Sequence, residues 1–315
     1  MQLQKSILFI LCCLNTLQSQ AQDTLVKPNY IPIIANWSLG DTLQYQRIKG
    51  VKKFENGQVK DSTATTTKIT LVVVDSTAST YVIRIFEDTD LTILQSLDLS
   101  TSDWDSLKTI FEGMYLEYET TELGAFRGFR NREKMYQGFS FLFERLIKKH
   151  MKGLTPEQQL RFAELMQVRK TQNFFEAKLS EDLSIMHKFY GLSYALDSTW
   201  HFEQTISNPL DTAIKFQIPN TLLTSMPEDW NGLVRLENEV FITDEPALSM
   251  IRSAVGEKMF EKVRETYVLN PPRYEGYTSY AFYPGDGFLE SMRTELNTYL
   301  GEQLLSQTFI EFWLQ

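Results

Sequence analysis

The sequence predicts an α+β fold in which antiparallel β-sheet predominates, with a helical insert near the middle of the chain. Alternating apolar and polar residues recur on both sides of a central block, as in Asp41–Ile48 and Leu233–Ile242. Between them, residues 131–190 change to apolar spacings of three and four. A hydrophobic period of two is typical of strands and one of 3.6 of helices, so the expected order is sheet, helices, sheet.

This order divides the chain into a leader, a first β unit, the helical insert and a second β unit. Their predicted bounds are residues 1–21, 22–130, 131–190 and 191–315. Similar features open and close the two β units: Leu39–Gln46 resembles Leu196–Gln204, and Tyr118–Phe126 resembles Tyr280–Phe288. We therefore expect the β units to be duplicates, although two unrelated β-rich segments could share such features by chance.

Turn residues define the hairpins expected in the first β unit. Asn56-Gly57 favours the left-handed turn positions of a tight hairpin, and Gly124 is expected at positive φ between two later strands. The strand patterns, rich in β-branched and aromatic residues, cover 41–48, 68–74, 81–86, 115–121 and 126–129. A short helix is also expected over 103–112, with Ser102-Asp103 at its start.

A helical hairpin or three helices are expected in the insert. The first is capped by Asn131, carries an apolar stripe and stops at Gly153. The second begins at Thr155-Pro156, with Gln158 completing a capping box. A third, of one or two turns, is expected to start at Ser180 and to continue through Phe189.

The second β unit repeats strand, helix and glycine-turn patterns. We expect a strand over 233–242, one helix over 246–263, and a hairpin whose turn places Gly287 at positive φ. The final strand, 307–313, alternates regularly and is expected to close one edge of a sheet.

The first 21 residues have the pattern of a cleaved export signal. Lys5 precedes the apolar run Ile7–Leu14, and Ser19-Gln20-Ala21 matches the small residues of a cleavage site. The run is too short to span a bilayer, which takes about 20 apolar residues. We therefore expect an exported protein that begins near Gln22 and has no transmembrane segment.

Cysteine usage and charge exclude several classes of function. The two cysteines, Cys12 and Cys13, lie within the leader, and the residue before each is not the small one that lipid attachment requires. The mature chain would then lack disulfides, cysteine-ligated metals and cysteine nucleophiles. A formal net charge of −9 gives no general attraction for phosphate backbones, so nucleic-acid binding is not expected.

No catalytic, cofactor-binding or metal-binding residue can be assigned from the sequence. The three histidines, His150, His187 and His201, are not spaced as ligands of one metal ion. Gly191–Ala195 is close to a nucleophile elbow around Ser193, but the expected order of helix then strand is the reverse of what an elbow needs. Asp197 and His201 follow too closely to complete a hydrolase triad.

Aromatic residues gather in and beside the insert. They are Phe139, Phe141, Phe143, Phe174, Phe175, Phe189 and Tyr190. Such a segment is expected to pack against the sheets on more than one side, and the alternative is a cover over an apolar ligand cavity.

Some of these features resemble a group of uncharacterised exported proteins of Gram-negative bacteria. The resemblance rests on the leader ending in Gln20-Ala21-Gln22, on Trp37 with Gly40-Asp41, and on the run Tyr118–Asn131. The strand content is also similar to the half-barrels of periplasmic lipoprotein carriers. The resemblance implies a curved sheet and assigns no site residue.

The function expected from these observations is non-catalytic binding of an apolar small molecule, a lipid or another envelope protein outside the cytoplasm. Two alternatives remain open. One is a hydrolase built from scattered Ser, Asp and His residues, and the other is a structural or assembly module that acts through exposed strand edges.

Overall fold

The computed structural model describes residues 29–87, 115–169, 171–208, 211–228, 232–255 and 257–315. The predicted leader and the helix expected over 103–112 lie outside the described residues. Residues 31–315 form one unit, to which the following paragraphs refer.

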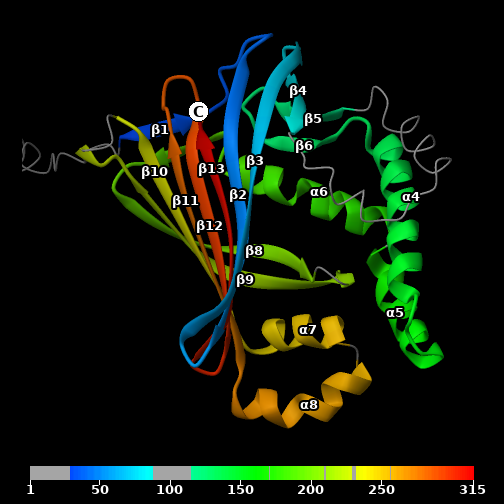
Figure 1. The fold of residues 1–315 in the computed structure, drawn as a ribbon. Helices are drawn as coiled ribbons and strands as arrows, with labels where there is room; N and C mark the ends of the chain where they lie inside the picture. Colours follow the sequence, from blue (N-terminus) through cyan, green and yellow to red (C-terminus); the bar gives the residue numbers. More distant parts are fainter. Residues whose placement is uncertain (1–28, 88–114, 170, 209–210, 229–231, 256) are drawn as a thin grey trace, which may run out of the picture. The chain divides into compact units, whose positions relative to one another are not determined.

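Within the described residues, an 11-stranded antiparallel sheet dominates the fold (Figure 1). The strands of the first half are β2 Thr42–Glu55, β3 Gln58–Ser76, β4 Thr80–Glu87, β5 Leu116–Thr121 and β6 Phe126–Phe129. Those of the second half are β8 Ser198–Asn208, β9 Asp211–Ser225, β10 Val234–Ile242, β11 Pro272–Phe282, β12 Leu289–Leu300 and β13 Gln303–Leu314. A short pair, β1 Tyr30–Ile33 and β7 Leu192–Ala195, lies beside it.

The sheet is two meanders joined at β2 and β13. The order is β6-β5-β4-β3-β2-β13-β12-β11-β10-β9-β8, so the chain runs outward from β2, crosses to the other edge, and returns to pair β13 with β2. Strands of both predicted β units thus share one sheet, while the unit boundaries and the duplication stay predictions. The expectation that the last strand closes an edge was wrong, because β13 has a neighbour on each side.

Helices connect the two meanders and interrupt the second. The insert contains α4 Arg132–Met151, α5 Pro156–Arg169 and α6 Gln172–Met186, and the later pair is α7 Asp244–Val255 and α8 Glu257–Leu269. α4 and α5 contact one another and α6, while α7 contacts β8 and β11. No helix of the described chain combines the length and apolar character needed to cross a bilayer.

The turn predictions are confirmed. Asn56 and Gly57 have φ of 53° and 77°, as a tight hairpin with two left-handed positions requires. Gly124 (φ 96°) lies between β5 and β6, and Gly287 (φ 67°) between β11 and β12. Thr155 and Gln158 form the expected capping box, with a Gln158 N–H to Thr155 Oγ1 bond of 3.3 Å.

Three helix expectations need correction. Asn131 precedes α4, but its side chain makes no cap; its amide donates to the Tyr115 carbonyl and accepts from Glu117 N–H at 3.4 Å. Ser180 lies inside α6 instead of starting a helix. The helix expected over 246–263 is two helices, α7 ending at Val255 and α8 beginning at Glu257.

Strand β9 was missed by the sequence analysis. Its pattern contains Pro219, a residue that argues against an interior strand because it cannot donate to the ladder. Pro219 lies opposite Glu203 of β8 and one residue beyond the last pair of β9 with β10, Asn220 with Val240.

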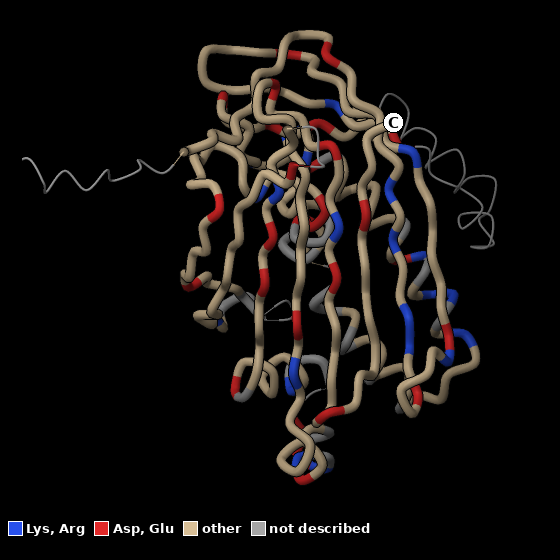
Figure 2. The backbone as a smooth tube through the Cα atoms, turned by 90° about the vertical axis from the view of Figure 1, so that its left-hand side faces the viewer, with Lys and Arg blue, Asp and Glu red and all other residues tan. Residues whose placement is uncertain are grey.

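The two faces of the sheet differ in chemistry. We call the face on which α6 packs the inner face, since the Tyr280 hydroxyl there donates to Ile185 O at 3.0 Å. Charged residues are distributed along the strands of the sheet (Figure 2), and some of them form ion pairs on the outer face. Among them Arg293 pairs with Glu295 and with Glu311, the latter at 3.5 Å. These ion pairs suit a solvated face, which also exposes the large apolar side chains of Leu223, Phe241 and Trp313.

Candidate functional site

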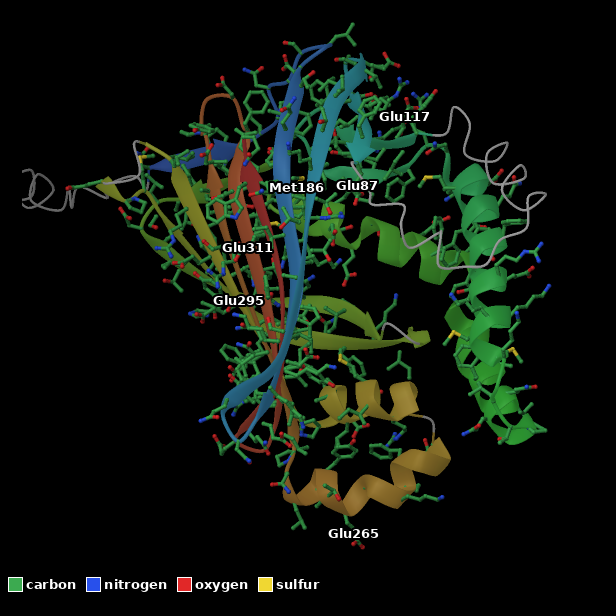
Figure 3. All side chains as sticks on the ribbon, in the orientation of Figure 1. Glu87, Glu117, Met186, Glu265, Glu295 and Glu311 are labelled. Atoms are coloured by element: carbon green, nitrogen blue, oxygen red, sulfur yellow. The ribbon has the colours of Figure 1, made fainter. Side chains whose placement is uncertain are left out.

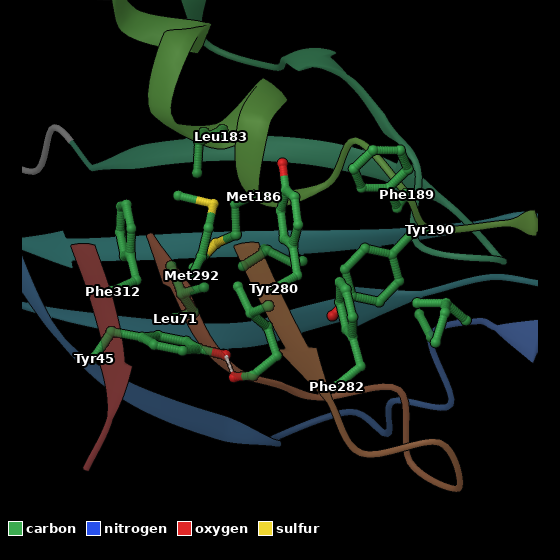
Figure 4. Packing of buried hydrophobic residues seen from close by; sticks show 14 of the residues in the cluster. Tyr45, Leu71, Leu183, Met186, Phe189, Tyr190, Tyr280, Phe282, Met292 and Phe312 are labelled. Atoms are coloured by element: carbon green, nitrogen blue, oxygen red, sulfur yellow. Dashed lines mark hydrogen bonds between the residues drawn. The ribbon is translucent and has the colours of Figure 1, made fainter. Parts of the chain in front are cut away.

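The inner face is filled with aromatic and aliphatic side chains where the end of α6 and residues 187–195 cover it (Figure 4). Tyr45, Tyr280, Phe282 and Met292 come from the sheet, and Met186 from α6. The Tyr45 hydroxyl, whose burial raises its pKa, donates to Leu289 O at 2.8 Å. This part of the inner face is packed core.

His187 is a buried structural residue of this core. Its Nδ1 lies 2.8 Å from the Gly124 carbonyl, and its Nε2 lies 3.0 Å from the Tyr118 hydroxyl. A carbonyl oxygen can only accept, so Nδ1 carries the hydrogen and Nε2 accepts from Tyr118. Burial lowers the pKa of His187 to about 4. The ring is therefore neutral and bonded at both nitrogens.

Lys188, the next residue, carries a half-buried ammonium group beside this core. Its Nζ donates to Asn238 Oδ1 at 3.0 Å, and Asn238 Nδ2 donates to Asn220 Oδ1 at 3.2 Å. Nζ also lies 5.3 Å from the centre of the Phe189 ring. Burial lowers the pKa of Lys188 from 10.5 to about 8.

No carboxylate pairs with Lys188 among the ion pairs of the described residues. An ammonium held by neutral groups in a poorly solvated place bears a desolvation cost that an anion would offset. Strongly shifted pKa values gather at functional sites, which makes Lys188 the leading candidate for a ligand contact.

On the inner face, the row of side chains next to that of Asn238 crosses six strands. Directly opposite residues of neighbouring strands point to the same face of the sheet. Following the opposite residue from each strand to the next gives the members of this row. It contains Phe202, Asn220, Val240, Gly276, Leu296 and Thr308, which we call the middle row. Five inter-strand spacings of about 4.8 Å make it about 24 Å long.

Apolar side chains of the middle row and its neighbour stay in contact with solvent. Phe202 is 38% and Leu296 40% exposed, and Trp200, one row above Phe202 on β8, is 43% exposed. Asn220, in contrast, is buried and connects the row to Lys188 through Asn238. Exposed apolar residues thus share a row with Asn220, which connects to Lys188 through Asn238.

On the other side of the sheet centre, ion pairs attach α6 to β2. Asp182 of α6 lies 3.2 Å from Arg47 Nη1 and 3.1 Å from Lys49 Nζ. Arg47 also pairs with Glu87 of β4. The side chain of Glu87 is labelled in Figure 3. These cations are neutralised, so they differ from Lys188.

The cavities of the described chain do not provide an enclosed ligand site. The cavity beneath Trp37 and His187 has a volume of about 20 Å³, room for about one water molecule. An open hollow of about 580 Å³ beside β6 is polar, and its Arg130 and Arg132 are paired with Glu119 and Glu176. Neither of these spaces is lined by Lys188 or by a residue of the middle row.

The residues considered for a hydrolase are not brought into one hydrogen-bonded arrangement. Ser193 is exposed on β7, and Asp197 is exposed with φ 52°. The His201 ring bonds the Thr221 hydroxyl at 3.2 Å, and His187 bonds Tyr118 and Gly124. Glu237 and Glu239 lie on the outer face of β10. Among the described residues, no group of three or more His, Asp and Glu side chains is arranged to hold a metal ion.

The aromatic residues of the insert form two groups. Phe139, Phe143 and Phe175 stack with Tyr136 between α4 and α6, with the Phe139 and Phe175 ring centres 4.6 Å apart. Phe189 and Tyr190 belong to the core, against Tyr280 and Phe282. Phe141 contacts the Arg145 guanidinium, and the side chain of Phe174 lies outside the described residues.

Sequence reasoning missed Lys188 and Asn238. In the sequence, Lys188 is one charged residue between apolar and aromatic neighbours, and Asn238 is one polar residue of an alternating strand pattern. The available signal was that Asn238 alternates in phase with Leu236 and Val240, which places an amide on the buried face.

No family model and no curated protein matches the chain. Among solved structures, it is similar to a lipovitellin structure described for its lipid–protein interactions, with a TM-score of 0.42, 9% identity, and coverage of 89% of this chain and 25% of that chain. A second similar structure is a protein of unknown function with a hot-dog fold from Alicyclobacillus acidocaldarius, with a TM-score of 0.14, 10% identity, and coverage of 89% of this chain and 81% of that chain. A third is a porin-like protein from Bacteroides uniformis, with a TM-score of 0.16, 6% identity, and coverage of 89% of this chain and 99% of that chain. At these TM-scores, none of the three supports an inference about function.

Proposed function

We propose that this protein binds an amphiphile with an anionic head group and an extended apolar chain, without catalysing a reaction on it. The head group would accept a hydrogen bond from the Lys188 ammonium, and the chain would lie along the middle row toward Phe202 or Leu296. The observation that carries the proposal is Lys188, a cation with a neutral amide partner beside exposed apolar side chains.

The energetics favour an anion over a neutral ligand. A hydrogen bond to a charged partner contributes about 1.5–3 kcal/mol, roughly twice a neutral one. The apolar chain would add about 25 cal/mol for each Å² removed from water. Residues 1–21 support a place of action outside the cytoplasm, which completes the proposal of an exported envelope protein.

A calorimetric titration with sodium dodecanoate, below its micellar concentration at pH 7, tests this function. Dodecanoate is expected to bind at least about tenfold more tightly than dodecyltrimethylammonium, which has the same chain and the opposite charge. Lys188→Met should weaken dodecanoate binding by about tenfold, or about 1.4 kcal/mol.

Lys68→Met is the matched control, since Lys68 is exposed on β3 and its cross-strand partner Gln46 lies on the outer face. Its affinity should equal that of the native protein. Melting curves check folding. Lys188→Met removes a poorly solvated charge but leaves the buried Asn238 Oδ1 without its donor, so its melting temperature should stay near that of the native chain. Equal affinity of both variants, or no binding of dodecanoate by the native protein, would contradict the proposal.

A further inference from the structure

Strand β8 is an exposed edge of the sheet. It ends the strand order, pairs with β9 on one side, and is 11 residues long. An edge strand presents unpaired backbone N–H and C=O groups that can template another strand. The opposite edge, β6, has only four residues. Each edge strand also contacts one helix, β6 with α6 and β8 with α7.

Side chains along β8 leave this edge accessible. Five consecutive residues, Thr199 to Glu203, are exposed, including the large apolar Trp200 and Phe202. The segment 198–206 contains no proline and no lysine, the residues that usually protect an edge from pairing. The edge therefore lacks two of the common protections, while Glu203 is its one charged side chain within 199–205.

The sequence of β8 is complementary to itself about Phe202. In antiparallel pairing of two copies centred there, Phe202 faces Phe202, and each His201 faces a Glu203. The next pairs outward are Trp200 with Gln204 and Thr199 with Thr205. Aromatic and Thr–Thr pairs are among the cross-strand combinations that stabilise antiparallel ladders, and an imidazole N–H can donate a hydrogen bond to a carboxylate.

Neighbouring two-fold registers lack this match. We consider dimers in which the inner faces of both copies lie on the same side of the joined sheet, which requires a two-fold axis perpendicular to the sheet. Directly opposite residues point to the same side, so in such a dimer the residue at the centre must lie opposite its own copy. Centring on Glu203 opposes two carboxylates, centring on Trp200 opposes Glu203 to Asp197, and centring on His201 opposes two imidazoles. The charges therefore select Phe202 as the centre.

We propose that two copies of this chain form a symmetric dimer through β8, antiparallel and centred on Phe202, which continues the sheet from one copy into the other. The two copies would use the same surface, as a closed two-fold interface requires. Trp200 and Phe202 would be partly covered by the same residues of the other copy. This inference does not depend on the ligand proposed above.

Directed crosslinking tests the register. In the full chain with Cys12→Ser and Cys13→Ser, Phe202→Cys should form an intermolecular disulfide on mild oxidation, because directly opposite residues lie within disulfide range. Thr205→Cys, exposed on the same strand, is the control; its two copies would be about 20 Å apart and should stay reduced. Equal crosslinking of both variants, or none, would overturn the register.

Sedimentation equilibrium tests the charge pairing. The native protein should dimerise, and His201→Glu should raise the dimer dissociation constant at least tenfold by placing two pairs of carboxylates together. The double variant His201→Glu/Glu203→His exchanges the two residues and should restore the native constant. A native monomer at 100 µM, or a double variant as weak as the single one, would overturn the dimer.

Discussion

Gly287→Ala is expected to lower the free energy of unfolding by at least about 3 kcal/mol. Gly287 has φ +67°, and a Cβ built there lies 1.8 Å from the carbonyl oxygen of Ile34. Because that neighbour is backbone, it cannot rotate away. The hairpin would have to move, and the 2.6 Å bond from the Tyr190 hydroxyl to Gly287 O would be disturbed.

Gly285→Ala is the matched control in the same hairpin. Its added Cβ meets nothing within 4 Å, and its φ is not in the left-handed region. Urea unfolding followed by circular dichroism should place Gly285→Ala within about 0.5 kcal/mol of the native protein. If both variants unfold at the native midpoint, the contact between this turn and Ile34 is not formed.

His187→Ala is expected to lower the free energy of unfolding by about 3–5 kcal/mol. The change leaves the Tyr118 hydroxyl and the Gly124 carbonyl without their partner in the core and opens a cavity among Trp37, Tyr118 and Tyr190. Ser193→Ala, at an exposed position of β7, is the control and should stay within about 0.5 kcal/mol. A His187→Ala protein as stable as this control would contradict the neutral, doubly bonded histidine.

His187 also predicts a dependence of stability on pH. Its pKa is about 4 in the folded protein and 6.5 ordinarily, so between these values the unfolded chain binds more protons. The free energy of unfolding should therefore fall as pH drops from 6.5 to 4, by about 3 kcal/mol for this group. His187→Gln removes that contribution, and the difference between the two pH profiles measures it; parallel profiles would contradict the low pKa.

Local features of the fold could be predicted from the sequence because local chemistry determines them. Asn56-Gly57, Gly124 and Gly287 specify turns through backbone conformations that other residues adopt at a cost. Thr155 and Gln158 specify a helix start through reciprocal hydrogen bonds.

The position of each strand in the sheet could not be predicted, because it depends on pairing between distant segments. β13 has the alternating pattern of an edge or an interior strand, and only its pairing with β2, far away in the sequence, decides between them. Pro219 shows the same limit, since its local preference opposed a strand that long-range pairing nevertheless forms.

The candidate site was invisible for a related reason. The pKa of Lys188 and its isolation from carboxylates arise where residues 187–195 cross β10, a contact between segments 50 positions apart. The spacing of residues along the chain does not predict that these two segments come into contact. The expected absence of a local catalytic motif led to the binding function, but not to the residue that would perform it.

Proton uptake on binding is the measurement that tests the proposed site most directly. Free Lys188, with a pKa of about 8, is half protonated at pH 8, and a bound anion would raise its pKa. Titrating dodecanoate at pH 8 in two buffers of different ionisation enthalpy should show an uptake of about half a proton per ligand. Lys68→Met should show the same uptake and Lys188→Met none. Binding without proton uptake by the native protein, or equal uptake by Lys188→Met, would show that the head group does not bind at Lys188.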